Sequence, residues 1–162
     1  MSVKSMDDLF LHLVKDMYNA EKQLVKALPK MAKKTQSAEL KKAFETHKDE
    51  TEGHVERLEK IFEMLDKRAQ GKTCVAMEGL VEEGKEAMDE IEDAEVLDAA
   101  LLAGAQAVEH YEISRYGTMV ALAKQLGMKD AAKLLDQTLE EEKKPDALLN
   151  RIALGNVNQQ AA

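Results

Sequence analysis

Apolar residues recur every three or four positions through most of the chain, which is the spacing of amphipathic helices. Capping and breaking residues divide this pattern into four long segments and a short one, at about residues 5–34, 37–68, 74–91, 93–127 and 129–154. Short breaks near positions 36 and 127 predict two antiparallel hairpins, joined through the short segment. We therefore expect an all-α four-helix bundle with a short fifth helix, as a single domain over residues 1–162 with a frayed tail from about residue 156.

Small polar side chains mark where the predicted helices begin, because they can accept hydrogen bonds from the free N–H groups of a first turn. We expect N-caps at Ser5, Ser37, Thr73 and Asp93. Gly127 suits the left-handed position that often follows a helix. Pro29 removes one helical hydrogen bond, so we expect a kink in the first helix.

The composition agrees with a helical protein and argues against several partners. Aromatic residues make up only 4% of the chain and there are two Pro, which disfavours a sheet. A net charge of −8 argues against nucleic acid, and no stretch approaches the roughly 18 apolar residues of a membrane span. The single cysteine, Cys74, allows no internal disulfide, which favours a reducing, cytoplasmic location. Cys74 itself is either a reactive thiol with a lowered pKa or a buried, inert residue.

Ionisable residues replace apolar ones at the middle of each long helical seam. The first segment has Glu21, the second has His47, Glu50 and His54, the third long segment has Glu109 and Glu112, and the last has Glu142. An isolated buried carboxylate is costly, so such groups must be paired, protonated or bound to a cation. Several of them at one level would repel one another unless positive charge lies between them, which favours a pair of metal ions.

The positions of these acids predict that they meet at one height. Glu21 lies 15 residues before position 36 and Glu50 lies 14 after it, while Glu112 and Glu142 each lie 15 residues from Gly127. At a rise of ~1.5 Å per residue, each acid sits roughly 22 Å from its own turn. Packing the two hairpins together would therefore bring all four helices' acids to the same level.

Helical bundles hold di-iron and di-manganese centres with a Glu from each of two helices and a Glu-x-x-His unit from each of the others. The present chain departs from that pattern, because Gly53 and Pro145 stand three residues after Glu50 and Glu142. The identity of the histidine ligand stays open, and we expect two iron or manganese ions per chain. The other candidate ligands are His47, His54 and Asp146, and the candidate hydrogen-bond donors to the carboxylates are Tyr18 and Tyr116.

Five stretches of the chain carry a family resemblance, and they are DMYNAEKQLVKAL, FETHKDETEGHVERLEKIF, CVAMEGLVEE, VEHYEISRYGTMVALAKQLG and LLDQTLEEEKKPDALL. Together they cover nearly the whole chain and resemble the YciE/YciF family of bacterial stress-associated proteins, most closely its YciF branch. The resemblance implies a ferritin-like bundle and a homodimer. It also implies site residues at Glu21, His47, Glu50, Glu109, Glu112 and Glu142, whereas position 54 is commonly Gln in that family, which makes His54 a weaker candidate.

The pattern and the resemblance together favour a stress-response protein that binds a dinuclear iron or manganese centre. Such a centre suits chemistry with peroxide, oxygen or ferrous iron, although the sequence names no redox partner. The alternative is a non-catalytic bundle that acts as a scaffold or an interaction module. In that case the acids share protons or pair with other side chains, and neutral substitutions would stabilise the fold.

Overall fold

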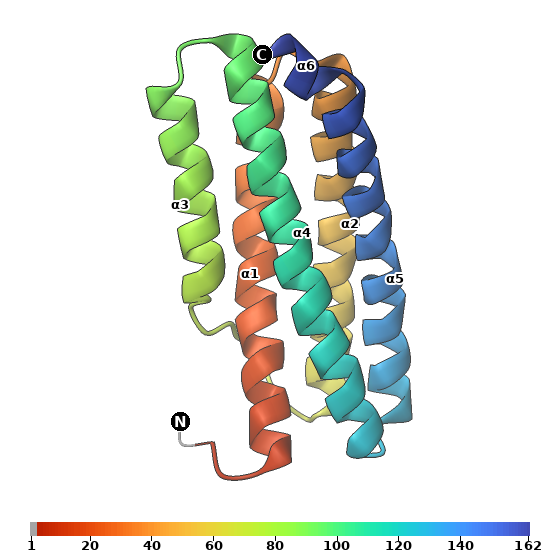
Figure 1. Ribbon diagram of the computed structural model, residues 1–162. Coiled ribbons are helices and arrows are strands. Elements are labelled where there is room, and N and C mark those ends of the chain that lie inside the picture. Colours follow the sequence, from red (N-terminus) through yellow and green to blue (C-terminus); the bar gives the residue numbers. More distant parts are fainter. Residues whose placement is uncertain (1–2) are drawn as a thin grey trace.

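The computed structural model describes residues 3–162, apart from the side chain of Asn156, and the described chain is helical with no strand (Figure 1). Its long helices are α1 (Met6–Lys34), α2 (Ala38–Met64), α4 (Ala94–Gln125) and α5 (Lys129–Ile152), and the short helix between the hairpins is α3 (Val75–Glu90). A π-helical turn (Ala153–Val157) and the short α6 (Asn158–Gln160) follow. The predicted all-α bundle of two long hairpins joined by a short helix is confirmed.

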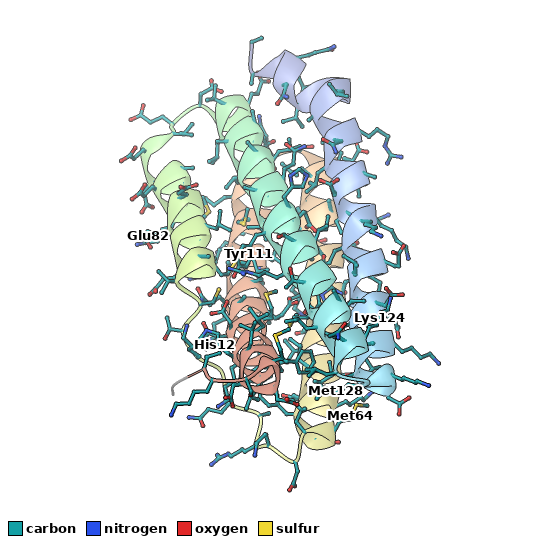
Figure 2. The ribbon with its side chains drawn as sticks, turned by 60° about the horizontal axis from the view of Figure 1, so that its bottom comes forward. His12, Met64, Glu82, Tyr111, Lys124 and Met128 are labelled. Carbon is teal, nitrogen blue, oxygen red and sulfur yellow. The ribbon has the colours of Figure 1, made fainter. Side chains whose placement is uncertain are left out.

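The two hairpins form the bundle, and α3 lies outside it. Helix α1 packs along α2, α4 packs along α5, and α2 closes the bundle against α5. Helix α3 lies against α1 and α4, and of its residues only Met77 is buried (Figure 1). The interior is filled by side chains, whereas Glu82 lies on the outer side of α3 (Figure 2). No helix within residues 3–162 has the length and apolar character needed to cross a bilayer.

Three of the predicted N-caps are confirmed, and the other helix boundaries differ in detail. The side chains of Ser5, Ser37 and Asp93 accept hydrogen bonds from first-turn N–H groups. Cys74, and not Thr73, occupies the cap of α3, without a side-chain capping bond. Helix α2 ends at Met64 and not near residue 68, because Asp66 adopts a left-handed backbone with φ of 52°.

The end of the chain is helical in the structure, whereas the sequence predicted a frayed tail from about residue 156. The helical backbone continues past Ile152 through the π turn and α6, and both elements contact α4. Ala153 and Val157 are buried there, so apolar contact with the bundle holds the segment in place. Gly127 has the expected left-handed conformation, with φ of 72°, and α1 runs through Pro29, which lies on its exposed side.

Asp98 of α4 fixes the connection between α1 and α2 to the second hairpin. Its carboxylate, which is 4% exposed, accepts a hydrogen bond from the Thr35 hydroxyl. It also accepts hydrogen bonds from the backbone N–H groups of Gln36 (3.2 Å) and Ser37 (2.8 Å). The first hairpin is therefore held at a defined height relative to α4, which sets the level at which their ionisable residues meet.

Candidate metal centre

Six ionisable side chains lie buried at the middle of the bundle, with all four long helices contributing. They are Glu21 from α1, His47 and His54 from α2, Glu109 and Glu112 from α4, and Glu142 from α5. The four glutamates have no exposed surface, and the two histidines are 5% and 1% exposed. The cluster therefore combines four carboxylates and two imidazoles away from solvent.

The donor atoms of these side chains fall into two groups, within each of which they lie no more than 4.8 Å apart. The His47 group consists of His47, Glu109, Glu112 and Glu142, and the His54 group consists of Glu21, His54 and Glu142. Glu142 belongs to both groups. The arrangement thus offers two adjacent positions for a cation, with one carboxylate common to them.

In the His47 group the imidazole lies between the carboxylates of α4 and α5. Its Nδ1 is 2.6 Å from Oε1 of Glu109. Its Nε2 faces Oε2 of Glu112 at 3.9 Å and Oε2 of Glu142 at 3.7 Å. Burial favours the neutral imidazole, but the contact with Glu109 and the nearby negative charge raise the pKa of His47 to about 9.

In the His54 group, one nitrogen of the imidazole faces the carboxylates at the centre of the bundle. Nδ1 of His54 is 2.9 Å from Oε1 of Glu142 and 3.7 Å from Oε1 of Glu21. Burial opposes its protonation, but Glu142 and Glu21 raise the pKa of His54 to about 10. The hydroxyl of Tyr116 donates to Oε1 of Glu21, as the sequence suggested, whereas that of Tyr18 donates to Glu59, outside both groups.

The carboxylates of the cluster repel one another in the metal-free chain. Burial raises the pKa of Glu109 to about 7, despite its contact with His47. Burial and the charges of Glu142 and Glu21 raise the pKa of Glu112 well above its usual range. Glu142 departs from this trend, because the contact with His54 lowers its pKa in spite of burial. Protons on the histidines and on part of the acids therefore balance the charge when no cation is bound.

Nine buried side-chain nitrogen and oxygen atoms of the cluster have no hydrogen-bond partner within the part of the chain that the structure describes. They are Oε2 of Glu21, Nε2 of His47, Nδ1 of His54 and both carboxylate oxygens of Glu109, Glu112 and Glu142. Several of them approach one another closely, but without the alignment of a hydrogen bond. Buried polar atoms are rarely left unpaired, and carboxylates with imidazole are ligands that iron and manganese accept. The donor set therefore fits a pair of such ions.

The structure places Glu50 outside both groups, unlike the sequence prediction. The buried face of α2 passes through His47, Thr51 and His54, and Glu50 is turned away from it and partly exposed. Successive helical residues are separated by about 100°, so a shift of one residue moves a side chain off the buried face. His54, the weaker candidate from the family resemblance, belongs to the cluster, and Glu50 does not.

Asp146 also lies outside the two groups. Its Oδ1 is 2.9 Å from Nε2 of His110, whose side chain is largely exposed. Asp146 stands one helical turn after Glu142, on a partly buried part of α5. The structure thus brings together Glu21, His47, His54, Glu109, Glu112 and Glu142, and leaves out Glu50 and Asp146.

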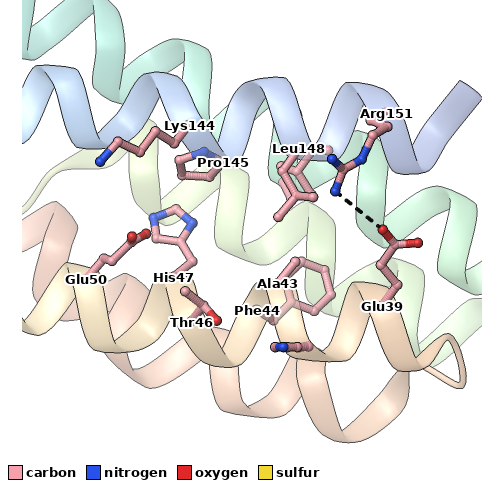
Figure 3. A pocket seen from close by; sticks show the side chains of 13 residues that line it. Glu39, Ala43, Phe44, Thr46, His47, Glu50, Lys144, Pro145, Leu148 and Arg151 are labelled. Atoms are coloured by element: carbon pink, nitrogen blue, oxygen red, sulfur yellow. Dashed lines mark ion pairs between the residues drawn. The ribbon is translucent and has the colours of Figure 1, made fainter.

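A cavity of about 480 Å³ between α2 and α5 reaches the cluster at His47. Figure 3 shows His47 and Glu50 on α2, opposite Pro145 and Lys144 of α5. The walls further along are mostly apolar, and an ion pair of 3.7 Å between Glu39 and Arg151 crosses the far end (Figure 3). Small molecules can therefore approach the His47 side of the buried cluster from solvent.

Of the two interpretations of Cys74, a reactive thiol or a buried, inert residue, the structure favours the second. Its side chain is 1% exposed, and its Sγ lies 3.0 Å from the hydroxyl of Tyr111. The Tyr111 hydroxyl donates to Asp16 at 3.2 Å. Burial raises the pKa of the Cys74 thiol, so this site does not favour the reactive thiolate.

Comparisons with known proteins point to one family. Residues 5–162 match the model of a family described as a domain of unknown function, DUF892. Protein YciF of Escherichia coli (strain K12) is 49% identical over 162 residues, which cover 99% of this chain and 98% of that protein.

Solved structures give the same fold over most of their length. The crystal structure of the E. coli stress protein YciF matches with a TM-score of 0.91 and 50% identity, covering 96% of this chain and 98% of that one. YcfI of Rhodopseudomonas palustris, for which a structural role has been suggested, matches with a TM-score of 0.90 and 44% identity, covering 92% and 95%. A protein from Xanthomonas campestris pv. campestris, 19% identical with a TM-score of 0.73 over 97% and 99% of the two chains, shares the fold alone.

Proposed function

Because this chain belongs to the DUF892 family, with the E. coli stress protein YciF among its relatives, we propose that it binds a dinuclear iron or manganese centre in a ferritin-like bundle. The observation that carries this proposal is the set of nine buried side-chain atoms that have no hydrogen-bond partner among the described residues, all of them on residues of the two groups. Buried polar atoms that are removed from water without a hydrogen-bond partner destabilise a fold, and a bound cation would give these atoms a partner.

The charge of the cluster matches two divalent ions. Four carboxylates carry four negative charges when ionised, and two neutral imidazoles add ligands without adding charge. One divalent ion would leave two of the four negative charges uncompensated, whereas two divalent ions would balance all four. Glu142 is the side chain common to both groups, so it is the residue that can bind both ions.

The distribution of the ligands differs from the usual di-iron pattern, although the donor count agrees with it. That pattern places one histidine on each of two helices, in Glu-x-x-His units. Here both histidines come from α2, seven residues apart, and α4 supplies Glu109 and Glu112. The set is still four carboxylates and two imidazoles, which is the complement that such centres require.

Iron or manganese at this place would supply a reversible one-electron redox couple. The protein's own residues provide the conditions for its use. The bundle excludes bulk water from the carboxylates, Tyr116 holds Glu21 by a hydrogen bond, and the cavity at His47 gives small molecules a way in. Reaction with peroxide or oxygen, or oxidation of ferrous iron, suits that arrangement and a role in the stress response.

The test is the metal content of purified protein after expression with iron or with manganese supplied. We expect about two ions per chain, and an optical spectrum of the iron-loaded protein that changes when peroxide is added. Glu142→Gln should lose most of the metal, whereas Glu50→Gln, which removes a charge at the cavity but no ligand, should keep it. Wild-type protein that stays metal-free, or Glu142→Gln protein with unchanged content, would refute the proposal.

A non-catalytic scaffold is the second candidate, favoured by the structural role suggested for the relative YcfI. In that function protons on His47 and His54 balance the buried acids permanently. Glu112→Gln would then stabilise the protein in every condition, because it relieves the repulsion between Glu112 and the carboxylates of Glu142 and Glu21. For a metal centre the same substitution lowers the melting temperature of the metal-loaded protein.

A further inference from the structure

The outer side of His54 is held by an ion pair that joins α2 to α5. While Nδ1 of His54 faces the centre, its Nε2 lies 3.2 Å from Oε2 of Glu141. Glu141 precedes Glu142 in the chain and points to the other side of the ring. The imidazole is thus held between a carboxylate of the cluster and a carboxylate outside it.

Glu141 is itself fixed by Arg57, which stands one turn after His54. The guanidinium donates from one nitrogen to Oε2 of Glu141 at 2.7 Å and from the other to Oε1 at 2.8 Å. The first nitrogen also donates to Oγ1 of Thr138, at 2.9 Å, and Gln137 donates to Oε1 of Glu141 at 3.4 Å. Both partners of the ion pair are largely shielded, with side chains 16% and 23% exposed. A two-pronged contact of this kind fixes the orientation of the carboxylate as well as its position.

We propose that Glu141, oriented by Arg57, is a positioning residue that holds His54 with Nδ1 as the metal-binding nitrogen and Nε2–H as a donor to Glu141. This inference rests on the proposed metal centre. A carboxylate that accepts the second N–H of a ligating histidine selects the tautomer, fixes the ring and increases the basicity of the free nitrogen. Glu141 needs no contact with the metal to act in this way.

Among the described residues, no carboxylate outside the cluster holds His47 in the way that Glu141 holds His54. Both of its ring nitrogens face carboxylates of the cluster itself, and its outer side borders the cavity. The two histidines of α2 therefore serve different positions. The His54 ring is held by a carboxylate outside the cluster. The His47 ring is held by carboxylates of the cluster itself, and it borders the cavity that small molecules can enter.

The experiment is a cobalt(II) titration of the full chain, with the visible spectrum and a competing chelator giving the affinity for each of the two ions. We expect Glu141→Ala to lower the affinity for one of the two ions by about 10–100-fold and to leave the affinity for the other unchanged. Glu141→Gln should recover part of the loss, because its amide oxygen can still accept the Nε2–H bond. Glu140→Ala is the matched control, since Glu140 is an exposed neighbour on α5 that forms an ion pair with Lys143.

Arg57→Ala tests whether the arginine acts through Glu141. It should lower the affinity for the same ion, and it should cause no further loss of affinity in protein that already carries Glu141→Ala. In protein loaded with zinc, the ring nitrogen shifts of His54 should indicate a bound Nδ1 and a protonated Nε2. A merely structural ion pair between α2 and α5 would change thermal stability in the metal-free protein while leaving these shifts and both affinities as they are.

The outcomes separate this inference from the proposed function. If wild-type protein binds two ions and Glu141→Ala binds both with unchanged affinity, the positioning role is refuted and the metal centre stands. Coordination of His54 through Nε2 would refute it equally. If wild-type protein binds no cobalt, the metal centre itself is refuted, and the role of Glu141 falls with it.

Discussion

Raising the pH should destabilise the metal-free protein, because the cluster relies on protons for its charge balance. The folded state holds His47 and His54 protonated well above the ordinary histidine range, since carboxylates surround both rings. A group whose pKa is raised by folding contributes stability below its unfolded pKa. That contribution is lost as the pH rises through the folded pKa. The loss of stability should therefore begin near pH 6.5 and be complete near pH 9 to 10.

The magnitude follows from the two histidines. A rise in the pKa of His47 from 6.5 to about 9 corresponds to about 3 kcal/mol of folding free energy. The rise in the pKa of His54 from 6.5 to about 10 corresponds to about 5 kcal/mol. The two values do not add, because Glu142 and Glu21 act on both rings. We expect a total loss of about 3–5 kcal/mol, which for a chain of this size lowers the melting temperature by roughly 6–20 °C.

The assay is urea unfolding followed by circular dichroism between pH 6.5 and 9.5, in chelator and again with manganese. A variant with both His47→Asn and His54→Asn gives the background from other titrating groups, and its stability should depend on pH much less steeply. With manganese bound, the wild-type profile should flatten, since the ions replace the protons. Metal-free wild-type protein whose stability stays constant or rises across this window would refute the reasoning.

Three further predictions concern other parts of the molecule. Asp98→Ala should lower the free energy of unfolding by about 2–3 kcal/mol in urea titrations, because it leaves two backbone N–H groups and a hydroxyl without their acceptor; a loss below about 1 kcal/mol would contradict this role. Cys74 should react slowly with a thiol reagent in native protein and quickly in urea, and fast native labelling would show that the site opens. We also expect a homodimer, seen by light scattering as twice the 18.0 kDa of the chain, and a mass of one chain would exclude it.

The height of the site was predictable from the sequence, because helical rise is constant and the turns near residues 36 and 127 are clearly marked. Those two facts are sufficient to bring Glu21, Glu112 and Glu142 to one level. Rotation about a helix axis is less well determined. A seam read at 3.5 residues per turn drifts against a helix of 3.6, by about 20° in each heptad. On α2, Glu50 lies about 60° around the helix axis from His47, whereas His54 lies only about 20° from it, so His54 stays on the buried face and Glu50 does not.

Pairings between helices were not predictable from the sequence. Asp98, Glu141 and Arg57 stand among 31 acidic and 23 basic residues, and their periodicity does not distinguish them from solvated neighbours. Their roles depend on which side chain of another helix lies opposite, as with Asp98 and Thr35, or Glu141 and His54. The end of the chain is a similar case, because Val157 is buried through the contacts of its turn with other helices, α4 among them.

The placement of both histidines on α2 bears on how the bundle folds before it meets a metal. Helices α1, α4 and α5 each bring buried acids to the centre, and α2 brings imidazoles. In the metal-free chain those imidazoles carry protons, with Nδ1 of His47 against Glu109 and Nδ1 of His54 against Glu142. The second helix thus supplies the positive charge that lets the other three pack. A cation that enters must displace those protons, so metal binding should release protons, and the affinity for metal should increase as the pH rises towards the histidine pKa values.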